Sequence, residues 1–81
     1  MTVLIYSKPD CVFCAKSKVY MAKHKIEYTE FLMGRDITRD EVIEQFPLMR
    51  TMPIILIDGK IIGGYTQLTE YFGGEHKRVN V

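Results

Sequence analysis

The spacing of apolar positions changes from one segment of the chain to the next, and each spacing predicts an element. Residues 2–6 form a continuous apolar run, typical of a strand buried on both faces of a sheet. Over residues 12–24 the apolar positions recur at steps of three and four, which predicts a helix. Its expected core face consists of Val12, Ala15, Val19 and Ala22. Residues 26–32 then alternate between apolar and polar, which predicts a second strand.

A second helix is marked by its first residues, after a loop at 34–37. Thr38 stands three residues before Glu41. This is the spacing of a capping box, in which each side chain accepts a hydrogen bond from the other residue's backbone N–H. Pro47 is expected to end the helix. Its expected core face consists of Val42, Ile43 and Phe46.

A hairpin is predicted in the second half of the chain. Two apolar runs, residues 54–57 and 60–63, are separated by Asp58-Gly59. An Asp-Gly pair between such runs favours a two-residue type I′ turn. The sequence therefore predicts two antiparallel strands here.

The last helix is expected over residues 66–72, with Gly73-Gly74 ending it and a frayed polar tail beyond. The elements then follow the order β-α-β-α-β-β-α. A β-α-β unit crosses over right-handed, and the hairpin adds two antiparallel strands. The expected fold is therefore α/β: a four-stranded mixed sheet with three helices on its two faces, which is the thioredoxin-like fold.

Composition and charge narrow the class of protein. The chain has 81 residues, of which 26% are charged and 47% hydrophobic, so we expect one globular domain over residues 1–81, acting as a monomer. The formal net charge of +1 gives no basic field that would attract nucleic acid. No apolar run approaches the roughly 20 residues that cross a bilayer, and no signal-peptide pattern is visible. We therefore expect a protein of the reducing cytoplasm.

The two cysteines of the chain, Cys11 and Cys14, stand at the head of the first predicted helix. Residues at this spacing share a helix face, so the sulfurs can approach disulfide distance. A structural zinc site needs four ligands, and His24 and His76 are the only histidines available. We therefore expect no metal site. Cys-x-x-Cys beside a β-α-β pattern instead indicates a redox pair of the thioredoxin-like type.

Thiol–disulfide exchange requires a thiolate, and the position of Cys11 favours one. Cys11 precedes a helix whose unpaired N–H groups and positive dipole end attract an anion, and Lys8 adds a cation nearby. We therefore expect the pKa of the Cys11 thiol to lie below the roughly 8.5 of a free cysteine. Cys14 is expected to remain a thiol and to resolve the mixed disulfide that Cys11 forms.

Three motifs together resemble those of the dithiol glutaredoxins. They are residues 5–14 (IYSKPDCVFC), 51–53 (TMP) and 62–65 (IGGY), in the family's order and structural context. The resemblance covers residues 3–72, and the small size of the chain is similar to that of the compact glutaredoxins of bacteriophages. It implies a thiol–disulfide oxidoreductase of the thioredoxin-like fold.

The resemblance also implies a glutathione groove beside Cys11. Pro53 is expected to be cis, so that the backbone before it pairs with the substrate like a strand. Backbone N–H groups at the start of the last helix would hold a carboxylate. The residues that the resemblance assigns to binding are Lys8, Phe13, Arg50, Thr51, Met52, Pro53, Gly64, Tyr65 and Thr66.

Two positions depart from the family pattern. Val12 stands where the family usually has proline, and this restores a backbone N–H beside the first cysteine. Tyr65-Thr66 stands where the family usually has a small residue followed by Asp or Ser. Thr66 can cap a helix, but it has no carboxylate for the ammonium group of glutathione.

Three functions follow from these residues. The first is a glutathione-dependent oxidoreductase without a tightly bound cofactor, acting on glutathione mixed disulfides or on protein disulfides such as that of ribonucleotide reductase. The second is a thioredoxin-like hydrogen donor reduced by a flavoprotein thioredoxin reductase, which Val12 and Thr66 favour. The third is an iron–sulfur cluster carrier, against which Cys14 and the bulk of Phe13 argue.

Overall fold

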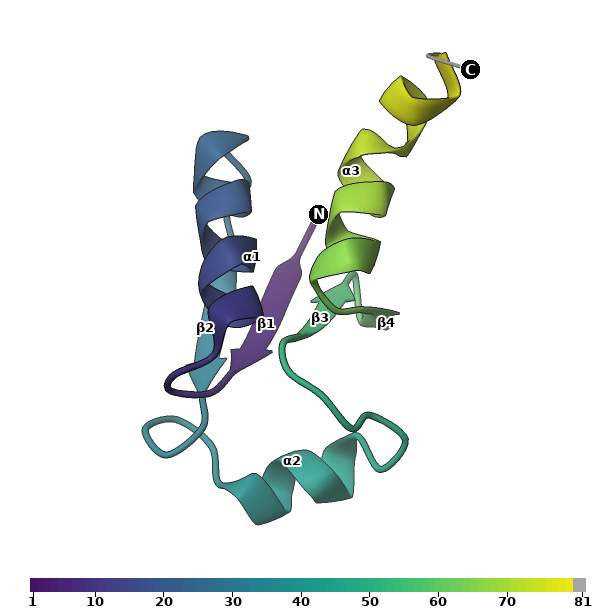
Figure 1. Ribbon diagram of the computed structural model, residues 1–81. Coiled ribbons are helices and arrows are strands. Elements are labelled where there is room, and N and C mark those ends of the chain that lie inside the picture. The colour runs from purple at the N-terminus through teal and green to yellow at the C-terminus, as the bar shows by residue number, and fades with distance from the viewer. Residues whose placement is uncertain (80–81) are drawn as a thin grey trace.

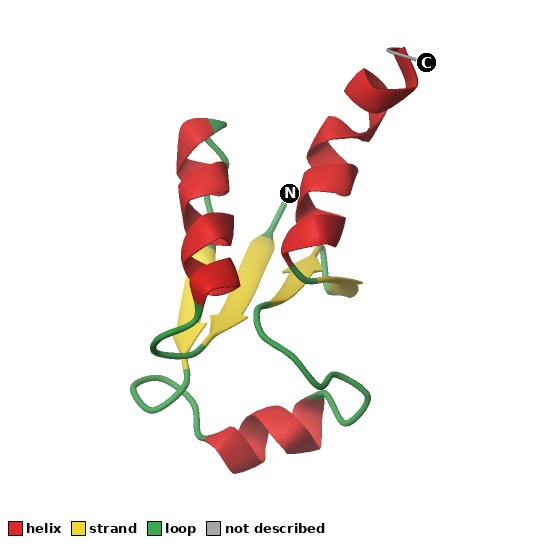
Figure 2. Cartoon of the chain, in the orientation of Figure 1, coloured by secondary structure: helices red, strands yellow, loops and turns green. Residues whose placement is uncertain are grey.

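The computed structural model describes residues 1–79 and has the predicted order of elements (Figures 1 and 2). The strands and helices are β1 (Val3–Ser7), α1 (Val12–Lys23), β2 (Thr29–Leu32), α2 (Arg39–Gln45), β3 (Ile54–Ile57), β4 (Lys60–Gly63) and α3 (Tyr65–Val79). In the described residues, no helix is both long and apolar enough to cross a membrane.

The four strands form one mixed sheet in the order β2-β1-β3-β4. β1 pairs with β2 in parallel and with β3 in antiparallel orientation, and β3 and β4 form the predicted hairpin. The thioredoxin-like fold expected from the sequence is confirmed. Because β1 is central, the loop that follows it emerges near the middle of the sheet edge (Figure 1). This loop ends at Cys11, and Cys14 follows in the first turn of α1.

The two faces of the sheet carry separate apolar clusters because side chains alternate along each strand. Helices α1 and α3 cover one face, and α2 lies across one end of the molecule (Figure 1). The cluster under α1 and α3 consists of Val3, Ile5, Met21, Ile55, Ile57 and Leu68. The cluster against α2 consists of Tyr6, Val42, Phe46 and Ile54.

Helix α1 turns a different face to the sheet from the one that the apolar pattern predicts. The predicted core positions are all exposed, namely Val12, Ala15, Val19 and Ala22. The buried residues are instead Cys14, Ser17 and Met21. Ser17 can be buried because its hydroxyl donates to the Phe13 carbonyl at 2.7 Å. The helix has apolar residues on two faces, and the long side chain of Met21, fully buried in the cluster, selects the one that packs.

Strand β2 begins at Thr29 rather than at residue 26. The Ile26 N–H donates to the Met21 carbonyl at 2.8 Å, and Lys25 has a φ of 58°. This segment therefore completes the C-terminal turn of α1 before the chain extends. Ile26 still packs against the core from outside the strand.

The capping box of α2 is confirmed. The Glu41 N–H donates to Thr38 Oγ1 at 3.1 Å, and the Thr38 N–H donates to Glu41 Oε1 at 2.9 Å. Val42 and Phe46 are buried as predicted, but Ile43 is 49% exposed and does not belong to the core. The reason is the shortness of α2, which presents only a narrow stripe at a spacing of four residues to the sheet.

The hairpin has the predicted type I′ turn, since Asp58 and Gly59 have φ values of 51° and 83°. A bulge follows in β4, because Ile55 pairs with Gly63 while Leu56 pairs with Ile61. The extra residue increases the local twist. It leads the chain from the sheet into the start of α3.

Helix α3 does not end at the glycine pair, as expected from the sequence, but continues through Gly73 and Gly74 to Val79. A glycine ends a helix when it adopts a left-handed conformation, and Gly73 does not have a positive φ. Just before it, Phe72 packs against the core. The frayed tail predicted after Gly74 is therefore wrong up to Val79, and its last part, residues 80–81, lies outside the described residues.

Candidate active site

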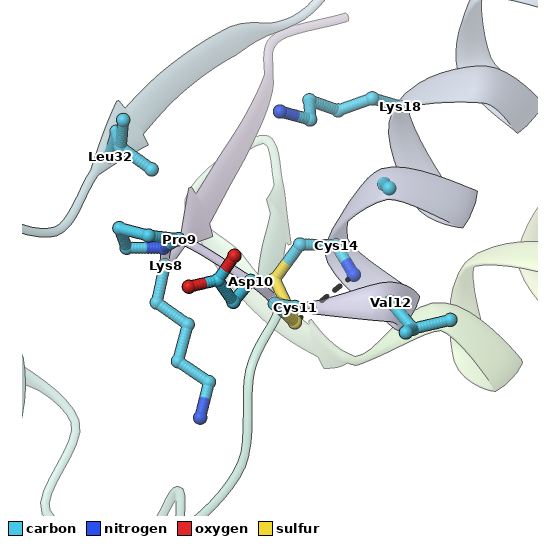
Figure 3. A pocket seen from close by; sticks show the side chains of 9 residues that line it. Lys8, Pro9, Asp10, Cys11, Val12, Cys14, Lys18 and Leu32 are labelled. Atoms are coloured by element: carbon cyan, nitrogen blue, oxygen red, sulfur yellow. Dashed lines mark hydrogen bonds between the residues drawn. A yellow bond between two sulfur atoms is a disulfide. The ribbon is translucent and has the colours of Figure 1, made fainter.

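The loop after β1 brings Cys11 to the start of α1. Asp10 takes a left-handed φ of 56°, and Cys11 follows in an extended conformation as the N-cap of the helix. Cys14 lies in the first turn, and the two residues are joined by a disulfide with a Cα–Cα distance of 5.2 Å (Figure 3). The two cysteines, whose spacing predicted that their sulfurs can approach disulfide distance, are therefore bonded in the structure.

The two sulfurs have different surroundings. Cys11 is partly exposed, and its Sγ accepts a hydrogen bond from the Cys14 N–H at 3.2 Å. The same sulfur lies 3.7 Å from the Met52 carbonyl oxygen. Cys14 is 2% exposed. The arrangement offers an accessible sulfur that a helix N–H stabilises as an anion, together with a buried partner.

The segment before β3 forms the far wall of the site. The Met52–Pro53 peptide bond is cis, as expected, and Pro53 is buried while Met52 is partly buried. Beside it lies a hollow of about 520 Å³, which we call the proline groove. The groove brings together seven residues predicted from the sequence: Phe13, Thr51, Met52, Pro53, Gly64, Tyr65 and Thr66.

Two predicted residues lie elsewhere. Lys8 is exposed and lines a second hollow, together with Cys11 and Cys14 (Figure 3). Arg50 is exposed and lines neither hollow.

Four further residues line the proline groove without having been predicted for it: Met49, Ile62, Gly63 and Gln67. Gln67 is the most informative of them. Its Oε1 accepts a hydrogen bond from the Gly64 N–H at 2.9 Å. A Gln three residues after the residue that precedes a helix is one half of a capping box, so the spacing of Gly64 and Gln67 was a usable signal in the sequence.

The start of α3 gives the groove its polar end. In the described residues, the N–H groups of Tyr65 and Thr66 have no hydrogen-bond acceptor, as is usual in the first turn of a helix. Such groups suit an anion. Gly64 leaves room beside them, because a Cβ there would lie 3.3 Å from the Pro53 carbonyl oxygen. Across the groove, the rings of Phe13 and Tyr65 lie 6.0 Å apart.

A polar network lies beside the second hollow. Lys18 extends from α1 toward β2 (Figure 3) and forms an ion pair with Glu30 at 2.9 Å. The fully buried Ser7 hydroxyl donates to the same Glu30 oxygen. These two hydrogen bonds, that of Ser7 first, hold the pKa of Glu30 below its ordinary value, against a smaller opposing effect of burial. The network joins the end of β1 to α1, the two segments that flank the cysteine loop.

Comparison with protein families gives a match over most of the chain. The glutaredoxin family model matches residues 3–62. The chain belongs to the glutaredoxin family. Hybrid peroxiredoxin hyPrx5 of Haemophilus influenzae is 35% identical over 71 residues, which cover 88% of this chain and 29% of that protein. The chain therefore spans less than a third of that relative. A glutaredoxin of the same organism is 31% identical over 84 residues, covering 90% of this chain and 97% of its own.

Solved structures are similar over nearly the whole chain. The glutaredoxin of Brucella melitensis is 26% identical with a TM-score of 0.73, over 99% of this chain and 85% of that one. A buckwheat glutaredoxin in complex with glutathione has a TM-score of 0.71 at 21% identity, over 94% of this chain and 73% of that one, and supports the fold alone. Family, fold and cysteine pair together identify this glutaredoxin as a thiol–disulfide oxidoreductase.

Proposed function

We propose that this glutaredoxin reduces mixed disulfides with glutathione and that Cys11 is the attacking nucleophile. The observation that carries the proposal is the contrast between the two sulfurs. Cys11 is partly exposed and its Sγ accepts a hydrogen bond from the Cys14 N–H, whereas Cys14 is 2% exposed. A substrate sulfur can therefore reach Cys11 first.

The exchange proceeds in two displacement steps. The Cys11 thiolate attacks the glutathione sulfur of a mixed disulfide, a bond forms between these sulfurs, and the client sulfur leaves as a thiolate that takes up a proton. A second glutathione thiolate then attacks the bond to Cys11, forms glutathione disulfide and releases the Cys11 thiolate. With a disulfide inside a protein client, Cys14 performs the second attack, and two glutathione molecules later reduce the Cys11–Cys14 bond.

The proline groove is the proposed glutathione site. The backbone of Met52, whose carbonyl oxygen lies 3.7 Å from Cys11 Sγ, would pair with the cysteinyl part of the tripeptide. The N–H groups of Tyr65 and Thr66 would hold its γ-glutamyl carboxylate. Lys8 and Arg50 lie outside the groove, and we propose them only as cations that attract the glycyl carboxylate from a distance.

One observation favours thioredoxin reductase as a second source of electrons. Among the described residues that line the proline groove, none carries a charge, whereas glutathione carries two carboxylates and an ammonium group. Thr66 and Gln67 can only offer neutral hydrogen bonds to that ammonium. A groove of this kind suits the backbone and apolar side chains of a protein partner as well as a charged tripeptide.

The proposed protein clients are cytoplasmic disulfides, among them the disulfide of ribonucleotide reductase. The similarity to hyPrx5 adds a second class, because that relative is a hybrid peroxiredoxin. We propose that this chain reduces a disulfide or glutathione adduct formed on a peroxiredoxin.

Paired assays test the proposal. Reduction of glutathionylated hydroxyethanethiol is followed with NADPH, glutathione and glutathione reductase, and again with NADPH and thioredoxin reductase. Turnover with glutathione supports the groove assignment. Turnover with thioredoxin reductase alone would support exchange by the cysteine pair but refute glutathione as its reductant. No turnover in either assay would refute the exchange chemistry as well as the reductant.

A further inference from the structure

An apolar face of α1 remains exposed, and it has the pattern of a helix interface. Val12 and Val19 are 65% and 66% exposed, and Ala15 and Ala22 lie on the same face. These four positions follow one another at steps of three, four and three. This is the a-d-a-d spacing of two heptads, so we call the four residues the α1 seam.

The seam is part of a groove. A hollow of about 520 Å³ is lined by Val12, Ala15, Val19 and Tyr20 of α1, together with Tyr65 from the start of α3. Figure 1 shows α1 and α3 on the same side of the sheet. A groove with one helical wall and an aromatic rim accepts a helix more readily than a flat surface does.

Two lysines flank the seam on one side. Lys16 and Lys23 also line the hollow and are seven residues apart, at the e positions of the same heptads. In the described part of the chain no carboxylate lies within ion-pair distance of either one, whereas Lys18, at the g position on the other side of the seam, is paired with Glu30. Helix α1 itself contains no acidic residue. Charges at e positions select partners of opposite sign.

The groove adjoins the site of exchange at two points. Val12 directly follows Cys11 in the chain. Tyr65 lines both this groove and the proline groove. A polypeptide whose sulfur reaches Cys11 can therefore continue past Tyr65 onto the seam.

We propose that the α1 seam docks an acidic amphipathic helix of the protein client, about two heptads long, while a cysteine beside that helix reacts at Cys11. The inference rests on the exchange chemistry proposed above. The client's apolar residues cover Val12 and Val19, and its carboxylates face Lys16 and Lys23. A membrane surface is disfavoured because helices that lie on membranes present large residues such as Trp, Phe and Leu, and this seam consists of valines and alanines.

The test uses two synthetic helical peptides. Each has Leu at the seam positions of two heptads and a glutathionylated cysteine after a short glycine spacer. One has Glu at the flanking positions and the other Lys. Attack by the Cys11 thiolate moves the glutathione to Cys11 and releases the peptide as a thiolate, which takes up a proton. A second glutathione thiolate then attacks the bond to Cys11, forms glutathione disulfide and releases the Cys11 thiolate. The measured quantity is kcat/KM at low ionic strength, where steering by charge is strongest.

The wild-type protein is expected to use the Glu peptide about tenfold more efficiently than the Lys peptide. The double variant Lys16→Glu/Lys23→Glu should reverse this preference. The double variant Arg39→Glu/Lys60→Glu changes the net charge equally on α2 and β4, at exposed positions that do not line the hollow, and should retain the preference for the Glu peptide. Val19→Gln should lower kcat/KM for both peptides. Equal rates on the two peptides, or equal behaviour of the two double variants, would overturn the proposal.

Two further measurements distinguish docking at the α1 seam from the exchange reaction at Cys11. All variants should reduce glutathionylated hydroxyethanethiol at the wild-type rate, and a failure of the wild type there would refute the exchange chemistry instead. Fluorescence anisotropy of the same peptides without cysteine then tests docking alone. Binding to anionic vesicles, or a dimer in sedimentation equilibrium, that Val19→Gln abolishes would assign the seam to a membrane or to a second copy and overturn the proposal.

Discussion

Lys18 Nζ lies 2.9 Å from Glu30 Oε2 and ties α1 to the edge strand β2, one turn beyond Cys14. The same oxygen accepts the hydroxyl of Ser7, the last residue of β1. One carboxylate therefore connects the segments on both sides of the cysteine loop. Because Ser7 is fully buried, no water could accept the hydrogen bond of its hydroxyl if the Glu30 carboxylate were removed.

The network predicts a specific dependence of stability on pH. The pKa of Glu30 is lowered in the folded protein, by Ser7 first and Lys18 second. Its contribution is therefore present above the unfolded pKa of about 4.3 and is lost as the pH falls through the lower folded value. Glu30→Gln should lower the free energy of unfolding at neutral pH by about 1 kcal/mol, and the difference from wild type should shrink in acid. Urea denaturation of both proteins from neutral to acidic pH measures this difference in the free energy of unfolding. The exposed Glu27→Gln serves as control, and equal losses for the two variants at all pH values would contradict the network.

The two cysteines should differ in function as they differ in exposure. Cys11→Ser is expected to abolish turnover of all disulfides because the accessible sulfur is gone. Cys14→Ser should keep turnover of glutathione mixed disulfides, since a second glutathione can resolve the bond to Cys11. With a protein disulfide, this variant should accumulate a covalent complex, visible by mass spectrometry under non-reducing conditions. Full activity of both variants would refute the assignment.

The anionic form of Cys11 should depend on the helix more than on Lys8. The Cys14 N–H donates to Cys11 Sγ at 3.2 Å, whereas Lys8 is exposed and, in the described residues, forms no hydrogen bond with this sulfur. In the Cys14→Ser protein we expect a Cys11 pKa below the roughly 8.5 of a free cysteine. Adding Lys8→Gln should raise this pKa by only a few tenths, because charges in water interact weakly. Ultraviolet absorbance of the thiolate measures both, and a Cys11 pKa near 8.5 without Lys8 would contradict the primary role of the helix.

Local motifs were the predictable part of the structure. The Asp58-Gly59 turn, the Thr38 and Glu41 capping box and the cysteine spacing each depend on neighbouring residues, so a short stretch of sequence contains the whole cause. The packed face of α1 could not be predicted from neighbouring residues alone, because α1 has two apolar stripes. The stripe with Met21 packs because this side chain meets residues of β1, β3 and α3, which are distant in the sequence. Gln67 was missed although its signal is local. The last helix was expected to begin at Thr66, and only a start at Tyr65 makes Gly64 the N-cap and Gln67 the third helical residue of a capping box.

Gly63 is expected to be required for the shape of the proline groove. Its φ is 122°, and a Cβ there would lie 2.7 Å from Gln67 Cγ. Gly59 has a similar φ of 83° but open space around it. Gly59→Ala should therefore lower the free energy of unfolding by about 1–2 kcal/mol through backbone strain alone. Gly63→Ala should lower it further, because the added Cβ also collides with Gln67. By displacing Gln67, this variant should also raise the KM for glutathione. Thermal unfolding and the glutathione assay measure the two effects. Equal stability losses with unchanged KM would show that Gln67 does not shape the groove.

Gly73→Ala decides where α3 ends. Had the glycine pair ended the helix with a left-handed residue, alanine at this position would be strained and destabilising. In the structure Gly73 lies within α3 without a positive φ, and an added Cβ would meet Tyr20 Oη at an ordinary contact distance of 3.7 Å. Alanine should then raise the free energy of unfolding by about 0.5–1 kcal/mol, because glycine loses more backbone entropy in a helix. Chemical denaturation measures the sign, and a loss of stability would place the end of the helix at Gly73.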